Sequence, residues 1–141
     1  IKKVRDAGAR IMLISDGDIS GVIATSQPDS GVDIYFGQGG APEGVLAAAA
    51  LRCIGGQMQG RLMLDTDEKR QRAQRMGISD PNRKYRTNEL ASGDVLFAAT
   101  GVTDGSLLSG VRFRKNSVRT ATVVMRSWSQ TVRWITAEHH R

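Results

Sequence analysis

Residues 36–50 read FGQGGAPEGVLAAAA, a glycine-rich turn that leads directly into an alanine-rich helix. Glycine lets backbone amides approach an anion closely, and the first turn of a helix carries free N–H groups and partial positive charge. Glu43 falls in that first turn, where its carboxylate either holds a metal ion beside the anion or simply matches the helix dipole. The segment therefore predicts a helix packed on a sheet, with a structural and a phosphate-binding interpretation both open.

The rest of the chain predicts alternating helices and strands in its first half and antiparallel strands in its second. Helices are expected at residues 1–7, 19–25, 42–54, 66–76 and 87–91, and strands at 9–15, 32–36, 57–64, 95–101, 111–114, 118–126 and 131–136. Gly8 and Gly55 are the expected helix stops, Pro42 the expected first helical residue, and Lys115-Asn116 a hairpin turn. The pattern favours an α/β fold with a mixed sheet and helices packed on it.

The formal net charge of +6 favours anionic partners such as phosphates, nucleic acid or acidic lipid. Two basic stretches carry most of it. We interpret residues 69–86 as containing a solvated surface helix, and residues 112–126 as an amphipathic edge strand. Aromatic residues make up only 5% of the chain, too few for a platform that stacks nucleic-acid bases. We therefore expect no nucleic-acid partner.

Targeting and redox signals are sparse. No apolar run is long enough to cross a membrane and no signal peptide is evident, so we expect a cytoplasmic protein without a membrane partner. The chain starts at Ile1 inside a helical pattern, and we expect it to be part of a longer protein. Cys53 is the single cysteine, which rules out an internal disulfide, and we expect it to be buried.

Acidic loops after the predicted strands are the candidate ligand sites, because ligands bind where loops leave the carboxyl ends of strands. Asp16, Gly17 and Asp18 follow the apolar run 9–15. The two carboxylates could bind sugar hydroxyls or a cation, and Asp18 could cap the next helix. A further loop, residues 100–105, has the sequence of either an anion nest or a turn, and we favour the turn.

Three segments carry a family resemblance: GARIMLISDGD at residues 8–18, GGAPEGVLAA at 39–48 and VLFAATGVTDG at 95–105. Together they resemble class II fructose-1,6-bisphosphatase, the bacterial GlpX type. The likeness extends over essentially the whole chain in the family's order, and the GGAPEG block is highly specific. The resemblance implies that residues 1–141 form the C-terminal α/β domain of a sugar bisphosphatase. The implied fold is the inositol-monophosphatase-like one, whose N-terminal part is absent from this chain.

The resemblance also implies a reaction and a site. The family hydrolyses the 1-phosphate of fructose 1,6-bisphosphate in gluconeogenesis with Mg²⁺ or Mn²⁺, and some cyanobacterial members also take sedoheptulose 1,7-bisphosphate. By position, Glu43 corresponds to the family's metal-binding glutamate. Asp16, Gly17 and Asp18 correspond to its substrate-contacting DGD, and Gly40 to its substrate-binding glycine. The implied assembly is a homotetramer.

The family's other metal carboxylates, its water-activating threonine and its basic phosphate pocket belong to the N-terminal part. We therefore assign no catalytic residue in this segment and expect the 141 residues alone to be inactive. Two alternatives stay open. One is a non-catalytic module that binds a phosphosugar or a nucleotide. The other is a basic nucleic-acid-binding domain, which the charge alone supports.

Overall fold

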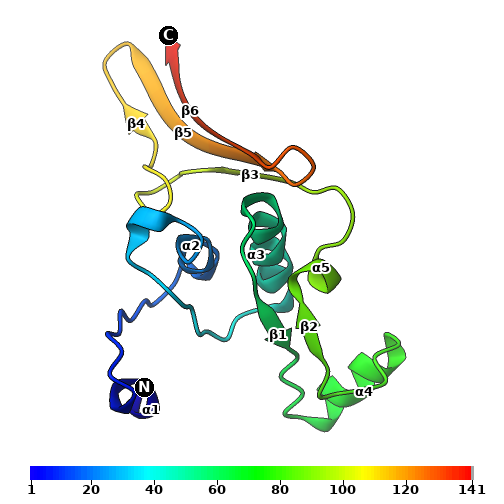
Figure 1. Ribbon diagram of the computed structural model, residues 1–141. Coiled ribbons are helices and arrows are strands. Elements are labelled where there is room, and N and C mark those ends of the chain that lie inside the picture. The colour runs from blue at the N-terminus through cyan, green and yellow to red at the C-terminus, as the bar shows by residue number, and fades with distance from the viewer. Residues whose placement is uncertain (141) are drawn as a thin grey trace.

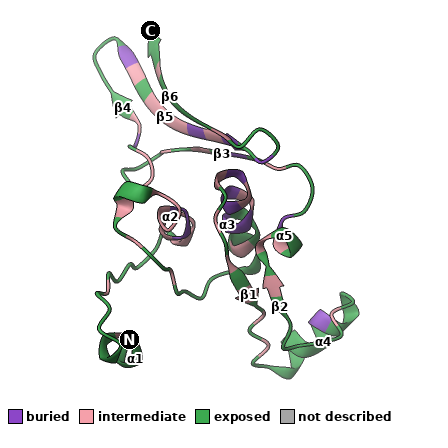
Figure 2. Ribbon diagram, viewed as in Figure 1, coloured by how far each residue is buried: buried purple, intermediate pink, exposed green. Residues whose placement is uncertain are grey.

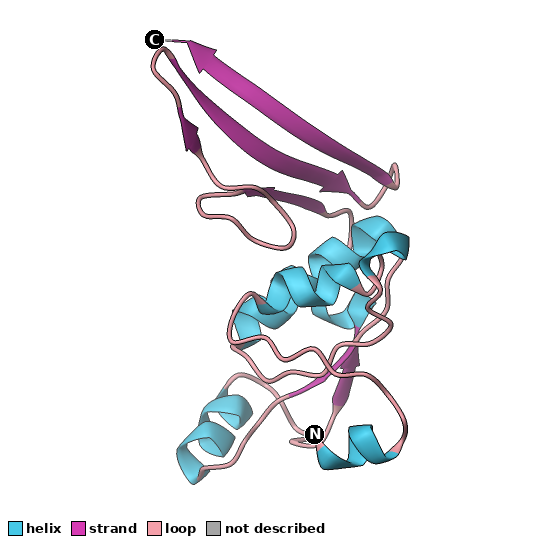
Figure 3. Cartoon of the chain, turned by 90° about the vertical axis from the view of Figure 1, so that its left-hand side faces the viewer, coloured by secondary structure: helices cyan, strands magenta, loops and turns pink. Residues whose placement is uncertain are grey.

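A four-stranded antiparallel sheet forms one layer of the molecule, and two helices cover one of its faces (Figure 1). The computed structural model describes residues 1–140. A second, two-stranded sheet lies on the far side of the helices, so that helices separate the two sheets (Figure 3). This confirms an α/β fold with helices packed on sheets. The sheets are not mixed as expected, because every strand pair within residues 1–140 is antiparallel.

The helices are α1 (Lys2–Asp6), α2 (Asp18–Ala24), α3 (Ala41–Ile54), α4 (Asp67–Arg75) and α5 (Thr87–Leu90), with a single 3₁₀ turn, η1 (Pro28–Ser30). The strands are β1 (Gln59–Arg61), β2 (Lys84–Arg86), β3 (Leu96–Thr100), β4 (Arg112–Phe113), β5 (Ser117–Arg126) and β6 (Thr131–His140). Every predicted helix is present within one or two residues. The strand expected at 57–64 is shorter, and the last strand is longer than expected.

Local signals set the ends of the helices. Helix α3 ends at Gly55, whose φ of 83° lies in the left-handed region that favours glycine. Pro42 is its second residue rather than its first, a position that also needs no intrahelical N–H. The capping role predicted for Asp18 is wrong, because Gly17 occupies the N-cap position and Asp18 is already inside helix α2.

Strand β5 is the centre of the four-stranded sheet. It pairs with β3 through Thr122–Arg126, with β4 near Val118, and with β6 along its whole length. The hairpin predicted at Lys115-Asn116 is confirmed, since the amide of Arg114 donates to the carbonyl of Ser117 at 2.8 Å. The interpretation of this basic stretch as an edge strand is wrong for β5, which has partners on both sides, with β6 lying outside it. It holds for the short strand β4, whose one partner within residues 1–140 is β5.

Two predicted strands do not form. Residues 9–15 and 32–36 are extended loops, and Met12, Leu13 and Phe36 are 73%, 67% and 73% exposed. A strand buried on both faces needs neighbours to complete its backbone hydrogen bonds. Within residues 1–140, no strand pairs with either segment, so the apolar pattern alone did not produce a sheet.

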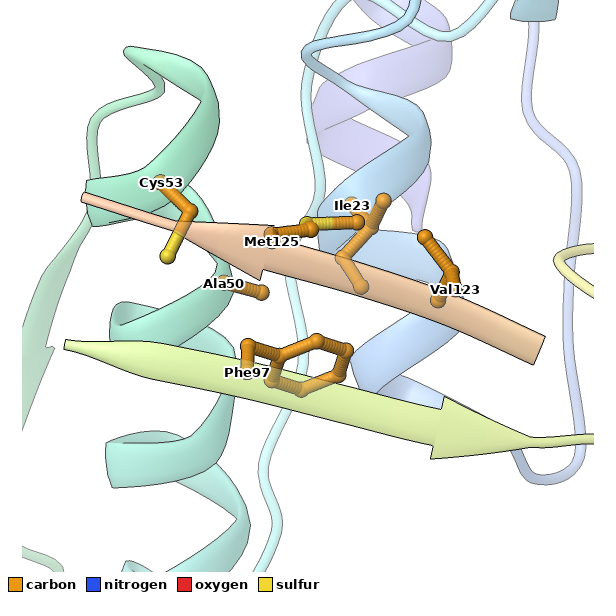
Figure 4. Packing of buried hydrophobic residues seen from close by; sticks show 6 residues of the cluster. All are labelled: Ile23, Ala50, Cys53, Phe97, Val123 and Met125. Atoms are coloured by element: carbon orange, nitrogen blue, oxygen red, sulfur yellow. The ribbon is translucent and has the colours of Figure 1, made fainter. Parts of the chain in front are cut away.

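The core lies between helix α3, helix α2 and the inner face of the sheet. Six buried residues meet there, as Figure 4 shows: Ile23, Ala50, Cys53, Phe97, Val123 and Met125. Small residues on α3 let the helix approach the sheet, while burial of a large apolar side chain contributes about 1.5–3 kcal/mol. The burial predicted for Cys53 is confirmed. Figure 2 shows that buried residues gather on α3 and on the sheet.

Helix α4 is the solvated helix that the charge pattern predicted. Thr66 caps it by accepting from the amide of Lys69, and Ala73 is its one buried residue. Ion pairs join Lys69 to Asp65 at 2.6 Å and Arg70 to Asp67 at 2.7 Å. Among the helices of residues 1–140, none combines the length and the apolar character needed to cross a membrane.

Candidate functional site

The glycine turn and the start of helix α3 place Glu43 at one side of the site. Gly40 has an extended backbone with φ −68° and ψ 150°, and the helix begins at the next residue. The carboxyl group of Glu43 folds back over Gly40. A Cβ added to Gly40 would overlap Oε2 of Glu43 and lie 3.1 Å from its Cδ. Gly40 thus leaves room for the carboxylate directly above the turn.

Asp18 meets the same turn from helix α2. Its Oδ2 lies 2.8 Å from the position that a Cβ on Gly39 would take. Helices α2 and α3 lie side by side in the layer that covers the sheet (Figure 1). The structure therefore brings together two of the loops that the sequence singled out, which are separated by about twenty residues along the chain.

A broad open groove of about 1840 Å³ contains this meeting point. Asp18, Gly39, Gly40 and Glu43 are among the residues that line it. Asp16 is exposed and is not part of the lining. The structure thus unites three of the five predicted site residues, Asp18, Gly40 and Glu43, in one groove. Gly17, with its φ of 77°, forms the tight turn before helix α2.

Tyr35 is a site residue that sequence reasoning missed. Its hydroxyl donates to Oδ1 of Asp18 at 2.7 Å. Burial raises the pKa of Tyr35, and the hydrogen bond to Asp18 and the negative charge of Asp18 raise it further, to about 12. No sequence motif or spacing predicts the contact between Tyr35 and Asp18, because it depends on how loop 32–36 folds back across helix α2.

Asp104 has a structural task in the third loop. Its Oδ1 accepts from the amide of Gly110 at 2.9 Å and from the guanidinium of Arg112 at 2.6 Å. The hydrogen bond from Arg112 and that from Gly110 hold the pKa of Asp104 below its ordinary value. Asp104 closes its own loop, in agreement with the interpretation of this segment as a turn.

Glu43 fits a hard divalent cation as one ligand among several. Carboxylate oxygen is the donor that Mg²⁺ prefers, and one or two protein carboxylates with substrate phosphate and water commonly complete its shell. Residues 1–140 contain no cluster of three or more Asp, Glu, His or Cys side chains that could hold a metal by themselves.

Comparison with known proteins gives a consistent result. The model of the family described as "Bacterial fructose-1,6-bisphosphatase, glpX-encoded" matches residues 1–139. Three similar relatives are each named D-fructose 1,6-bisphosphatase class 2/sedoheptulose 1,7-bisphosphatase. They come from Synechococcus sp. (strain JA-3-3Ab), 45% identical, Synechococcus elongatus, 47% identical, and Crocosphaera subtropica, 45% identical. Each alignment covers 99% of this chain and 44% of the relative. The chain therefore spans less than half the length of these relatives.

Proposed function

Since the chain belongs to the family of bacterial, glpX-encoded fructose-1,6-bisphosphatases, we propose that it supplies the C-terminal part of a metal-dependent sugar bisphosphatase. The complete protein would release the 1-phosphate of fructose 1,6-bisphosphate, a step of gluconeogenesis. One observation carries the proposal beyond family membership. Asp18 and the glycine turn, which the resemblance assigns to substrate, lie against each other in the groove that also receives Glu43.

The residues of the two loops would divide the work of binding substrate. Asp16 and Asp18 would accept hydrogen bonds from sugar hydroxyls, with Gly17 shaping the turn between them. Gly40 and the first turn of helix α3 would face phosphate, because free backbone N–H groups and the helix dipole favour an anion there. Holding both ends of the sugar phosphate would fix the reacting group, and positioning of this kind lowers the barrier of a displacement at phosphorus.

Glu43 would supply one carboxylate ligand to a Mg²⁺ or Mn²⁺ ion. When bound, such an ion polarises phosphoryl oxygens and activates water for attack. The position of Glu43 in the first turn of α3 places its carboxylate beside the N–H groups proposed to face phosphate. Metal and phosphate would therefore meet at one end of one helix, which supports joint rather than separate sites.

The test of this proposal uses the intact protein that contains this segment. Phosphate release from fructose 1,6-bisphosphate is measured with Mg²⁺, with Mn²⁺ and with a chelator, and sedoheptulose 1,7-bisphosphate is compared. We expect turnover that the chelator abolishes. We also expect no turnover from the 141 residues alone, because the further metal ligands are missing. Absence of turnover from the intact protein would contradict the proposal.

A non-catalytic module that binds phosphosugar is the competing outcome of the same test. Calorimetry with fructose 6-phosphate, in the presence and absence of Mg²⁺, separates the two functions, because only the phosphatase should couple ligand and metal. We further propose that the intact protein is cytoplasmic, and that it is a homotetramer, as the resemblance implies. Light scattering coupled to size-exclusion chromatography measures the mass of the assembly.

A further inference from the structure

Tyr35 lies between the two loops of the proposed site and contacts both of them. Its hydroxyl donates to Oδ1 of Asp18 at 2.7 Å, from a segment seventeen residues further along the chain. Asp18 opens helix α2, and Tyr35 precedes the glycine turn by one residue. The hydrogen bond therefore ties the start of helix α2 to the entrance of the turn.

Glycines make the place of the Tyr35 ring possible. A Cβ on Gly21, in helix α2, would lie 3.0 Å from Cε2 of Tyr35. A Cβ on Gly37, in the glycine turn, would overlap the hydroxyl oxygen and lie 2.6 Å from Cε1. The ring thus lies between a glycine of helix α2 and a glycine of the turn. A side chain at Gly37 would overlap the ring, and one at Gly21 would be in tight contact with it.

The two oxygens of the Asp18 carboxylate consequently have different neighbours. Oδ1 receives the hydroxyl of Tyr35, while Oδ2 faces Gly39 of the glycine turn. A carboxylate that accepts a hydrogen bond from a fixed phenol keeps one rotamer, so the entropy of ordering it is already lost before a ligand binds. With its pKa near 12, the phenol keeps its proton and remains a donor throughout the physiological range.

We propose that Tyr35 is a positioning residue for sugar-phosphate binding: its hydroxyl orients the Asp18 carboxylate so that Oδ2 stays directed at the glycine turn. The inference rests on the proposed function, in which Asp18 accepts hydrogen bonds from the sugar. Tyr35 acts through Asp18 and needs no contact with the substrate. Its hydroxyl contributes to affinity in the ground state and the transition state alike.

The test compares the intact enzyme with its Tyr35→Phe variant, which keeps the ring and removes only the hydroxyl. We expect KM for fructose 1,6-bisphosphate to rise by about 5- to 10-fold, with kcat changed by less than about 2-fold. The lost interaction stabilises the bound substrate and the transition state equally, so its removal weakens binding without slowing the chemical step. Tyr85→Phe is the matched control. Tyr85 is the chain's other tyrosine, its ring lies under the guanidinium of Arg83, and its hydroxyl donates to no residue among 1–140.

A double-mutant cycle separates positioning from a purely structural role. In an Asp18→Ala background, Tyr35→Phe should change KM by less than about 2-fold, because no side-chain oxygen remains for the hydroxyl to orient. Equal effects of Tyr35→Phe in both backgrounds, or an unchanged KM in the single variant, would overturn the inference. Thermal midpoints of all variants show whether each is folded.

Calorimetric affinity for fructose 6-phosphate provides a readout that does not depend on turnover. If Tyr35→Phe weakens this affinity and Tyr85→Phe does not, the inference is supported even in a protein without phosphatase activity. An active wild type with an unaffected Tyr35→Phe variant would refute the role of Tyr35 alone. An inactive wild type whose ligand affinity still depends on Tyr35 would refute the proposed reaction alone.

Discussion

Oε2 of Glu43 occupies the space that a side chain at Gly40 would need, and Cδ of Glu43 lies 3.1 Å from the position of that missing Cβ. The backbone of Gly40, with φ −68°, is one that any residue adopts. Glycine is therefore required here for space rather than for backbone freedom. The space belongs to the carboxylate that the resemblance assigns to metal.

Gly40→Ala should accordingly displace the Glu43 carboxylate with little effect on folding, because a flexible side chain can move aside. In the intact enzyme, we expect the Mn²⁺ concentration for half-maximal activity to rise by about 10-fold, in the range seen when the surroundings of a metal ligand are disturbed. A metal titration of phosphate release measures this change.

Gly44→Ala is the control for that substitution. A Cβ on Gly44 meets no atom within 4 Å, although the residue lies on the same helix. We expect unchanged Mn²⁺ activation and a gain of about 0.5–1 kcal/mol in the free energy of unfolding, since alanine favours the helix over glycine. If Gly40→Ala and Gly44→Ala needed the same Mn²⁺ concentration for half-maximal activity, the position of the carboxylate would not depend on Gly40.

The titration of Tyr35 reports its contact with Asp18. We expect a pKa of about 12 in the wild type and a lower value in Asp18→Ala, where burial still raises the pKa but the hydrogen bond and the negative charge are gone. The ¹³Cζ resonance, assigned with the Tyr35→Phe variant, gives both values. Because the folded pKa is raised, the contribution to stability is complete below pH 10 and is lost as pH rises toward 12. A wild-type pKa near 10 would show that the hydrogen bond does not form.

Asp94 joins the start of β3 to the end of β5. Its Oδ2 accepts from Arg126 at 2.7 Å, and its Oδ1 accepts from Ser127 at 3.0 Å and from the amide of Trp128 at 3.2 Å. The hydrogen bond from Arg126 is the main cause that lowers the pKa of Asp94. Asp94→Asn should lower Tm by a few degrees at pH 7, about 2–4 °C.

The pH dependence of that difference follows from the direction of the shift. A carboxylate with a lowered folded pKa stabilises the protein above its unfolded pKa, and the contribution is lost as pH falls through the folded value. The Tm difference between wild type and Asp94→Asn should therefore shrink below about pH 4. Asp29→Asn is the control, because the side chain of Asp29 has no hydrogen bond or ion pair within residues 1–140. A difference that persists unchanged at pH 3 would contradict this account.

Cys53 should be inert in the folded protein. It is fully buried between α3 and the sheet, its thiol lies 3.6 Å from the carbonyl oxygen of Val95, and burial raises its pKa. Labelling with iodoacetamide, followed by mass spectrometry of the peptide that contains Cys53, should show modification only after denaturation. Cys53→Ala should lower the free energy of unfolding by about 1 kcal/mol. Rapid labelling under native conditions would mean that this part of the core opens.

The sequence predicted those parts of the fold that depend on local signals. Helix α3 follows from Pro42, the alanine run and Gly55, and α4 follows from its charge pattern, with Asp67 and Glu68 in the first turn. The apolar runs at 9–15 and 32–36 predicted strands that are absent here. A strand depends on neighbours as much as on its own residues, and an apolar run does not supply them.

The candidate site likewise combines a contact that the sequence predicted with contacts that it did not. Glu43 and Gly40 are neighbours on a single helix turn, so a local motif was enough to predict their proximity. The approach of Asp18 to Gly39 and the contact of Tyr35 with Asp18 arise from packing between α2 and the glycine turn. No spacing in the chain encodes these contacts, and Tyr35 was therefore missed.

We propose that Glu43 binds a divalent cation rather than only matching the dipole of its helix. Glu68 provides the comparison, because it also lies in the first turn of a helix, α4, and is exposed. If each glutamate only interacted favourably with the dipole of its helix, the substitutions Glu43→Gln and Glu68→Gln would have similar effects. If Glu43 binds the metal, only the substitution of Glu43 would weaken metal binding.

The decisive measurement is Mn²⁺ affinity by calorimetry, together with phosphate release, for Glu43→Gln and Glu68→Gln in the intact enzyme. We predict that Glu43→Gln weakens Mn²⁺ binding and lowers kcat by more than about 100-fold, since even residues behind the metal ligands contribute 10- to 100-fold. Glu68→Gln should match the wild type in both. Unchanged metal affinity and turnover in Glu43→Gln would show that Glu43 is not a metal ligand.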